Sequence, residues 1–198
     1  MTSCRIEIIL GPMFSGKSTE LMRRCSRKEV IGKKVCYINH TFDTRTGDFV
    51  QTHAQHRKDA IKLSKLFDID LSSNIFKESD VFGIDEAQFF PDLYDFVLKC
   101  EENNKTVIMS GLDGDSDRKP FGQILNCIPL CDSVVKLTAM DMINKDESDG
   151  IFSLRISENT DQVLVGAQDK FLAVSRKNYL EKTKKYEKCE KCKKLGMN

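Results

Sequence analysis

A glycine-rich loop near the N-terminus carries the clearest chemical signature in the chain. It fits the pattern G-x-x-x-x-G-K-[S/T] at every fixed position. In such a loop the backbone N–H groups point at phosphate oxygens, and the following helix adds partial positive charge. The pattern therefore predicts a site for a nucleoside triphosphate, and the alternative is a glycine-rich turn that matches by chance. The residues of the loop are Gly11, Pro12, Met13, Phe14, Ser15, Gly16, Lys17 and Ser18.

Two kinds of side chain could handle the phosphates and the reacting proton. We expect Lys17 to reach the β- and γ-phosphates and the Ser18 hydroxyl to bind Mg²⁺. Asp85 and Glu86 end an apolar run, where a parallel sheet binds its ligands. We expect Asp85 to hold Mg²⁺ through water and Glu86, turned to the other side, to take a proton from an attacking hydroxyl or water. The alternative is a pair of solvated carboxylates at a strand end.

Hydrophobic patterning predicts the elements that would position these groups. Strands rich in β-branched residues alternate with amphipathic helices, which indicates an α/β fold with a parallel central sheet covered on both faces. A polar stretch without clear period, 40–59, is predicted to be a long loop. The predicted strands are 5–10, 34–38, 80–86, 106–112 and 133–137, and the predicted helices are 18–31 and one that Pro91 opens and that stops near Asn103.

The pattern changes after Ala139, which suggests a second, smaller domain. Segments 151–156 and 162–166 read as the two strands of a β-hairpin with a long loop. We therefore divide the chain into a phosphate-loop core over 1–139, a small β domain over 140–180 and a lysine-rich tail over 181–198.

Composition excludes several classes of protein. The chain has 198 residues, 40% of them hydrophobic, and a formal net charge of +1, so we expect neither nucleic acid nor an anionic membrane as the main partner. No apolar run is long enough to span a bilayer, and a charge interrupts the first apolar stretch, so we expect no signal peptide and a cytoplasmic location. Eight irregularly spaced cysteines are predicted to be free thiols.

Several further segments extend the pattern over most of the chain. They are GPMFSGKSTELMRR from residue 11, DTR from 43, IDEAQFFPD from 84, LDG from 112, RKPFG from 118 and VVKLTA from 134. In order and spacing these segments closely resemble the type II thymidine kinases, the family of cytosolic vertebrate, bacterial and poxviral enzymes. The resemblance runs from about Ile8 to Tyr179.

The resemblance implies a P-loop NTPase core with a small, lasso-like β domain, and transfer of the ATP γ-phosphate to the 5′-hydroxyl of a deoxynucleoside, expected to be thymidine. It places Glu86 as the general base and Arg45 as a cation near the reacting groups. It also implies a homotetramer. The residues it assigns to the substrate site are Phe89, Leu112, Ser116, Phe121, Gln162, Val163, Leu164, Val165, Gly166 and Phe171.

The chain departs from the family at its structural zinc site, normally two C-x-x-C pairs. These four positions hold Asp141, Asn144, Ser175 and Asn178, and asparagine and serine are poor zinc ligands. We therefore expect no zinc there. Our hypothesis is that packing replaces its contribution, through Met140, Met142, Phe171 and Tyr179. The one C-x-x-C pair present, Cys189 and Cys192, is expected to be two exposed thiols in the basic tail, although redox sensing through this pair stays open.

Two departures concern the base. Ser116 stands where the family usually has phenylalanine, and Phe171 where it tends to have tyrosine. A stacking face and a hydrogen-bonding group are lost, so phosphorylation of another deoxynucleoside is one alternative. The other is a nucleotide-binding regulator that has lost catalysis, against which the intact Lys17, Asp85 and Glu86 argue.

Overall fold

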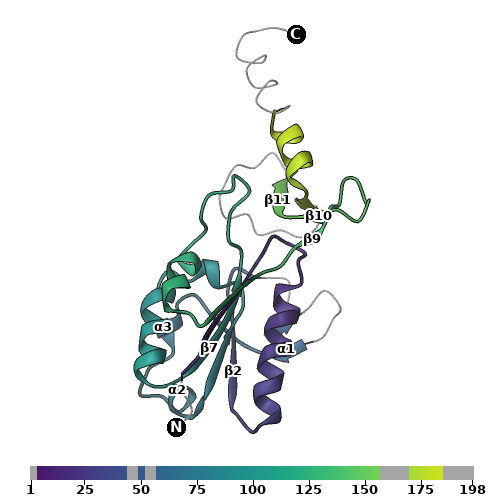
Figure 1. Cartoon of the computed structure of the whole chain (residues 1–198). Coiled ribbons are helices and arrows are strands. Elements are labelled where there is room, and N and C mark those ends of the chain that lie inside the picture. The colour runs from purple at the N-terminus through teal and green to yellow at the C-terminus, as the bar shows by residue number, and fades with distance from the viewer. Residues whose placement is uncertain (1–3, 44–48, 52–56, 157–169, 185–198) are drawn as a thin grey trace.

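A six-stranded parallel sheet forms the centre of the fold (Figure 1). The computed structural model describes residues 4–43, 49–51, 57–156 and 170–184. The strand order is β5-β2-β6-β7-β1-β8, with all five neighbouring pairs parallel, as the α/β prediction requires. The strands are β1 (Ile6–Leu10), β2 (Val35–His40), β5 (Ile61–Leu63), β6 (Val81–Ile84), β7 (Thr106–Gly111) and β8 (Ser133–Lys136).

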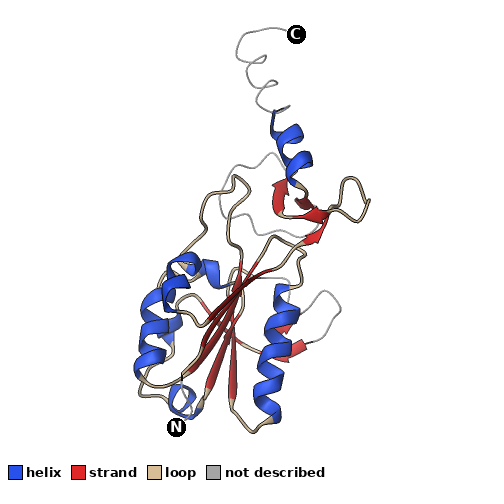
Figure 2. Cartoon of the chain, in the orientation of Figure 1, coloured by secondary structure: helices blue, strands red, loops and turns tan. Residues whose placement is uncertain are grey.

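Helices cover both faces of this sheet, with α1 on one side and α3 on the other (Figure 2). Side chains of β1 alternate between the two faces, because successive residues of a strand point in opposite directions. Ile8 packs with Phe96 on the α3 side, and Ile9 packs with Leu21 on the α1 side. The helices are α1 (Lys17–Val30), α2 (Asn74–Glu78) and α3 (Leu93–Glu102), with 3-10 turns η1 (Leu66–Asp68), η2 (Ala87–Phe89) and η3 (Ile124–Leu130).

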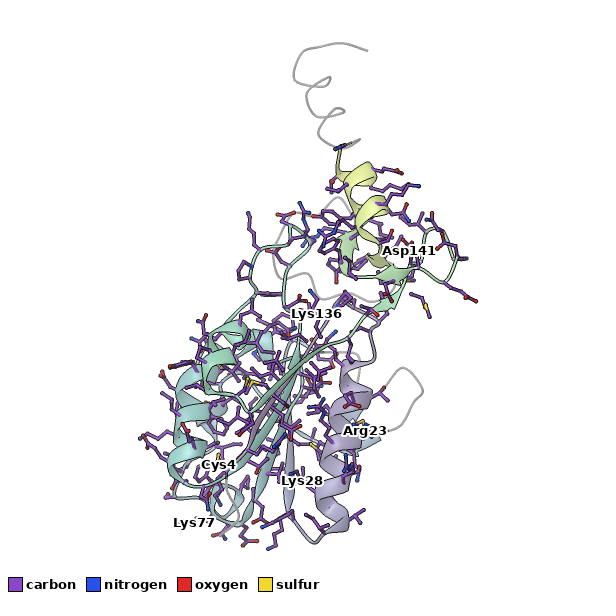
Figure 3. The ribbon with its side chains drawn as sticks, in the orientation of Figure 1. Cys4, Arg23, Lys28, Lys77, Lys136 and Asp141 are labelled. Carbon is purple, nitrogen blue, oxygen red and sulfur yellow. The ribbon has the colours of Figure 1, made fainter. Side chains whose placement is uncertain are left out.

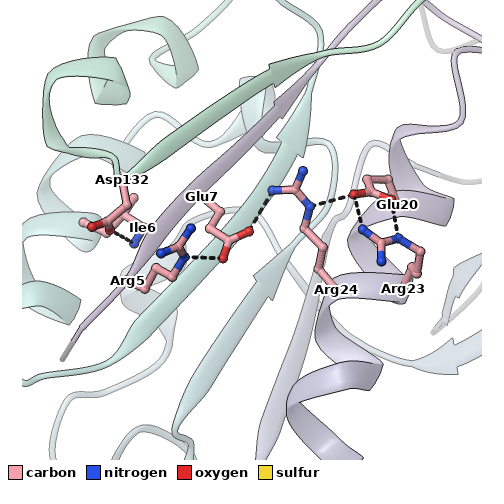
Figure 4. Close-up of polar contacts among 7 residues, drawn as sticks. All are labelled: Arg5, Ile6, Glu7, Glu20, Arg23, Arg24 and Asp132. Atoms are coloured by element: carbon pink, nitrogen blue, oxygen red, sulfur yellow. Dashed lines mark hydrogen bonds and ion pairs between the residues drawn. The ribbon is translucent and has the colours of Figure 1, made fainter. Parts of the chain in front are cut away.

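A charge network ties β1 to α1 (Figure 4). Glu7 is charged but only 8% exposed, and its Oε2 pairs with Nη1 of Arg24 at 2.7 Å. Arg24 also reaches Glu20, through Nε to Oε1 at 2.8 Å, and Arg5 pairs with the other oxygen of Glu7. Because β1 and α1 carry the two ends of the glycine-rich loop, this network helps to fix the span that the loop must bridge.

The segment 40–59, predicted to be a loop, contains a short hairpin. In it β3 (Phe49–Gln51) pairs antiparallel with β4 (Arg57–Asp59). A strand of three residues is too short to show an alternating pattern, and all three residues of β4 are charged, so the sequence did not reveal this pair. Residues 44–48 and 52–56 lie outside the described part.

A small β region lies beyond the carboxyl edge of the sheet (Figure 1). It contains two antiparallel pairs, β9 (Ala139–Met140) with β10 (Asp149–Gly150) and β11 (Phe152–Arg155) with β12 (Phe171–Val174), followed by a helix over 176–184. The predicted pairing of β11 with 162–166 concerns a segment that lies outside the described residues, and the described partner of β11 is β12. Leu154 of β11 and Val174 of β12 bury against Tyr179 and form the core of this region. Within the described ranges no helix has the length and apolarity needed to cross a membrane.

Candidate active site

The glycine-rich loop connects the end of β1 to the start of α1, which is the placement that phosphate binding requires. Its turn depends on left-handed backbone at Phe14 (φ 65°) and Gly16 (φ 82°). Nζ of Lys17 donates to the carbonyl oxygen of Pro12 at 2.6 Å, and the Ser15 hydroxyl donates to the same oxygen at 2.8 Å. The loop is therefore closed around one carbonyl, with the lysine lying over it. A phosphate group offers the ammonium a stronger, charged acceptor.

Gly11 has a steric role at the start of the loop. A Cβ there would lie 2.6 Å from the backbone oxygen of Leu137 and 2.6 Å from Oγ of Ser15. Its φ of 151° also lies in a region that other residues rarely adopt. Glycine at this position lets β1 enter the loop directly beside the chain that follows β8.

Asp85 follows β6 directly and is buried against two hydroxyls. The Ser110 hydroxyl donates to Oδ1 of Asp85 at 2.5 Å. Burial raises the pKa of Asp85, and the neighbouring charge of Glu86 raises it further, while hydrogen bonds from Ser110 and Ser18 oppose that rise. The two side chains expected to hold Mg²⁺, Ser18 and Asp85, thus lie near enough to interact. Hydroxyl and carboxylate oxygens are the ligands that this ion prefers, so the residues fit it.

Glu86 lies one residue further on, in a left-handed backbone conformation with φ 51° and ψ 40°. This conformation is uncommon for a residue with a side chain, and such residues concentrate at functional sites. Nε2 of Gln88 donates to Oε2 of Glu86 at 2.7 Å. The Glu86 carboxylate is therefore held by a neighbour that the sequence did not point out.

Aromatic side chains gather beside this pair of carboxylates. Phe89 meets Phe121 edge to face at 5.5 Å between ring centroids, and it meets Phe42 in the same way at 5.7 Å. His40 lies 5.5 Å from Phe89, and burial lowers its pKa. Phe89 and Phe121, which the resemblance assigns to the base pocket, are thus neighbours and could offer apolar faces to a nucleobase.

The remaining substrate residues divide between the core and the small β region. Leu112 follows β7, and its N–H donates to Oε1 of Gln88 at 3.0 Å. The carbonyl of Ser116 accepts a hydrogen bond from the Tyr179 hydroxyl at 2.6 Å, which ties its loop to the small β region. Phe171 is buried in β12, with the guanidinium of Arg155 over its ring at 5.4 Å.

The phosphate loop also touches the small β region. The backbone N–H of Met13 donates to the hydroxyl of Ser153, on β11, at 3.0 Å. Sequence reasoning had no signal for this contact, because nothing in a serine on a short strand says which loop it will face. Arg45, segment 162–166 and the pair Cys189 and Cys192 lie outside the described residues.

A hydrogen-bonded carboxylate occupies the centre of the region where the family places zinc (Figure 3). Oδ1 of Asp141 accepts from the backbone N–H groups of Ile143 at 2.8 Å and Asn144 at 3.2 Å. Oδ2 accepts from the N–H of Ser175 at 2.8 Å and from Nδ2 of Asn178 at 2.7 Å. Both oxygens are engaged by donors, so these four positions do not fit a zinc ion.

The four donors also decide the charge of Asp141. Burial by itself would raise the pKa of this carboxyl, but the hydrogen bonds from Ser175, Ile143 and Asn178 outweigh it and hold the pKa well below its usual value. The hypothesis that four side chains replace the metal by packing is wrong for Met140, which is 66% exposed, whereas Phe171 and Tyr179 are buried. Within the described residues no group of three or more His, Cys, Asp or Glu could hold a metal.

The described cysteines are free, as expected for thiols that pack as small apolar groups. This holds for all six, Cys4, Cys25, Cys36, Cys100, Cys127 and Cys131. Burial raises the pKa of Cys36 to about 11 and of Cys25 to about 12, so these thiols stay protonated and unreactive at neutral pH.

A parallel α/β sheet with this loop and two carboxylates at its carboxyl edge defines a P-loop nucleotide-binding protein equipped for phosphoryl transfer. A family model described as thymidine kinase matches residues 4–179. The thymidine kinase of vaccinia virus (strain Western Reserve) is 42% identical over 91% of this chain and 99% of its own length. Those of raccoon poxvirus and variola virus are 42% and 40% identical over the same shares. The chain belongs to the thymidine kinase family and is an ATP-dependent deoxynucleoside kinase.

Proposed function

We propose that this protein transfers the γ-phosphoryl group of ATP to the 5′-hydroxyl of thymidine, with Glu86 as the general base. The observation that carries the proposal is the placement of Glu86, which follows directly on Asp85 at the end of β6 and adjoins the aromatic cluster of Phe89 and Phe121. A base beside apolar rings and next to a phosphate site is what a nucleoside acceptor requires.

The phosphate loop binds the nucleotide and orients its terminal phosphoryl group. Its backbone N–H groups and the N-terminus of α1 supply positive potential, and Lys17 neutralises charge on the β- and γ-phosphates. Asp85 and Ser18 would hold Mg²⁺, which when bound would offset negative charge on the phosphates. Most of the rate enhancement in such a transfer comes from positioning and electrostatics, so the rigid sheet beneath these residues is part of the mechanism.

Glu86 accepts the proton of the attacking 5′-hydroxyl as the oxygen–phosphorus bond forms, and ADP leaves with the electrons of the broken bond. The Gln88 amide donates to Oε2 of this carboxylate at 2.7 Å and so holds it in place. Arg45 is proposed to stabilise charge at the transferring phosphoryl, a role supported by its place in the family motif.

Thymidine is proposed as the acceptor because the relatives carry that name and the apolar cluster suits a pyrimidine. Ser116 is the observation that favours another deoxynucleoside as the alternative acceptor, because a small polar residue stands here where the family usually has an aromatic ring. The cytoplasm as location and a homotetramer as assembly are proposed on the family resemblance.

The test is a phosphoryl-transfer assay with ATP, Mg²⁺ and each deoxynucleoside in turn, on three proteins: wild type, Glu86→Gln and Glu101→Gln. Glu101 is an exposed carboxylate at the end of α3, so its variant is a matched control. We expect thymidine to be phosphorylated, with kcat about 10²–10⁴-fold lower in Glu86→Gln and unchanged in Glu101→Gln. Turnover of another deoxynucleoside in preference to thymidine contradicts the assigned acceptor. ATP binding without turnover of any acceptor indicates a regulator instead of an enzyme.

A further inference from the structure

The amide of Gln88 bridges two parts of the site that come from different strands. Its Nε2 donates to Oε2 of Glu86 at 2.7 Å, and its Oε1 accepts from the backbone N–H of Leu112 at 3.0 Å. Glu86 follows β6, whereas Leu112 follows the neighbouring strand β7. One side chain therefore links the proposed base to Leu112, which the family resemblance assigns to the wall of the base pocket.

The orientation of this amide is fixed by its partners. A backbone N–H can only donate, so the Gln88 oxygen must face Leu112. The NH₂ group then has to face the Glu86 carboxylate, which when ionised can only accept. A flipped amide would set donor against donor at one end and acceptor against acceptor at the other. The two hydrogen bonds thus specify a single arrangement, and the one to the carboxylate is charge-assisted and therefore the stronger.

The surroundings of Gln88 leave it little freedom to move. Its side chain is 3% exposed. A Cβ on Gly111 would lie 2.5 Å from Oε1 of Gln88, and a Cβ on Gly122 would lie 1.9 Å from the Gln88 carbonyl oxygen. Glycine at both positions allows two stretches of backbone to close on Gln88 from different sides. A polar side chain confined in this way holds its hydrogen-bond partners in place.

The need for such a partner follows from the backbone at Glu86. Its φ of 51° is a left-handed conformation that a side-chain-bearing residue keeps only when its surroundings enforce it. The turn is closed by the N–H of Phe89, which donates to the Glu86 carbonyl at 3.1 Å, so that Gln88 stands inside the same turn as the carboxylate it holds.

We propose that Gln88 is a positioning residue, which holds the Glu86 carboxylate in the orientation for proton transfer and sets it at a fixed distance from the pocket wall at Leu112. The inference rests on the proposed role of Glu86 as the base. Gln88 itself does not touch the reacting atoms, and it acts through the carboxylate.

Two substitutions separate its two hydrogen bonds. Gln88→Glu keeps the shape and an oxygen for the Leu112 N–H, but it replaces the neutral amide donor with a second carboxyl group, which at this distance either repels the Glu86 carboxylate or shares a proton with it. Gln88→Met keeps the length and removes both bonds. We expect kcat to fall about tenfold to a hundredfold in each variant, because a displaced catalytic group costs rate steeply. The KM for ATP should stay within about twofold of wild type, since the phosphate loop is untouched.

A third protein, Glu86→Gln/Gln88→Met, tests whether Gln88 acts through Glu86. In single-turnover assays its residual rate should equal that of Glu86→Gln alone, because a residue that only positions the base has nothing left to position. If the second substitution lowers the rate again by its full factor, the proposal is overturned. It is also overturned if Gln88→Glu retains wild-type kcat, which would assign Gln88 only to the support of Leu112.

Folding and the proposed base are checked separately. Thermal midpoints and ATP binding identify any variant that fails to fold, and should Gln88→Met do so, the isosteric Gln88→Glu carries the test through its kcat and its KM for ATP. Wild-type activity in Glu86→Gln would refute the proposed base itself. A severe loss in Glu86→Gln combined with unchanged kcat in both Gln88 variants would refute the positioning role alone.

Discussion

Substitution of Asp141 by asparagine should destabilise the protein strongly although the two side chains have the same shape. The wild-type carboxylate accepts four N–H donors and is 2% exposed. Asparagine keeps one acceptor oxygen and turns an NH₂ group toward the donors of Ser175 and Asn178. Each buried donor that loses its acceptor costs about 1–3 kcal/mol, so we expect a total loss of about 3–5 kcal/mol. For a chain of this size that corresponds to a fall in Tm of about 6–20 °C.

The assay is urea and thermal unfolding of wild type, Asp141→Asn and Asp146→Asn. Asp146 is the matched control, because it is an exposed aspartate of the same segment and its carboxylate accepts hydrogen bonds from the nearby Ser148. Its variant should stay within about 1 kcal/mol of wild type. Hydrogen exchange should localise the effect, with protection lost at the amides of Ile143 and Ser175, which bond directly to the carboxylate.

The effect of pH has a definite sign. The folded pKa of Asp141 lies below its unfolded value, so its contribution is fully present above about pH 4 and declines as the pH falls toward the folded pKa. The difference in unfolding free energy between wild type and Asp141→Asn should therefore be constant from pH 5 to 8 and shrink in more acidic buffer. Equal stability of the two proteins at pH 7 would refute the reasoning.

Two further pairs of substitutions test the frame around the phosphate loop. In Gly11→Ala the new Cβ would lie 2.6 Å from the Leu137 carbonyl oxygen, so ATP binding measured by calorimetry should weaken at least tenfold. In Gly16→Ala the new Cβ would meet no atom within 4 Å, so this variant should lose only about 1–2 kcal/mol of unfolding free energy through backbone strain. Glu7→Gln breaks the partly buried pair with Arg24 and should lower the unfolding free energy by about 2–4 kcal/mol, whereas Arg23→Ala removes an exposed pair and should cost about 1 kcal/mol or less.

Local signals in the sequence were sufficient for much of the core. The phosphate loop, the apolar strands and the carboxylates after β6 each lie within a few consecutive residues, and the physics that shapes them is equally local. These are the features that the structure places where the sequence indicated, and the family match agrees with the fold they imply.

The features that escaped prediction depend on contacts distant in the chain. Asp141 meets Ser175 and Asn178 only after the chain has returned through β12, and no rule of spacing pairs them. The bond from Gln88 to Leu112 likewise joins two strand ends that are neighbours only in the folded sheet. The pairing of β11 with β12 likewise depends on distant contacts, because Leu154 and Val174 bury together with Tyr179.

The hydrogen bond between Met13 and Ser153 connects the small β region directly to the phosphate loop. The donor, the Met13 N–H, belongs to the loop that is proposed to bind the triphosphate. The acceptor, the Ser153 hydroxyl, lies on β11, 140 positions later in the chain. A change in the backbone of this loop on nucleotide binding would therefore act on β11 through this hydrogen bond. The Ser153 hydroxyl thus couples occupancy of the ATP site to the conformation of the small β region, which the resemblance assigns to nucleoside binding.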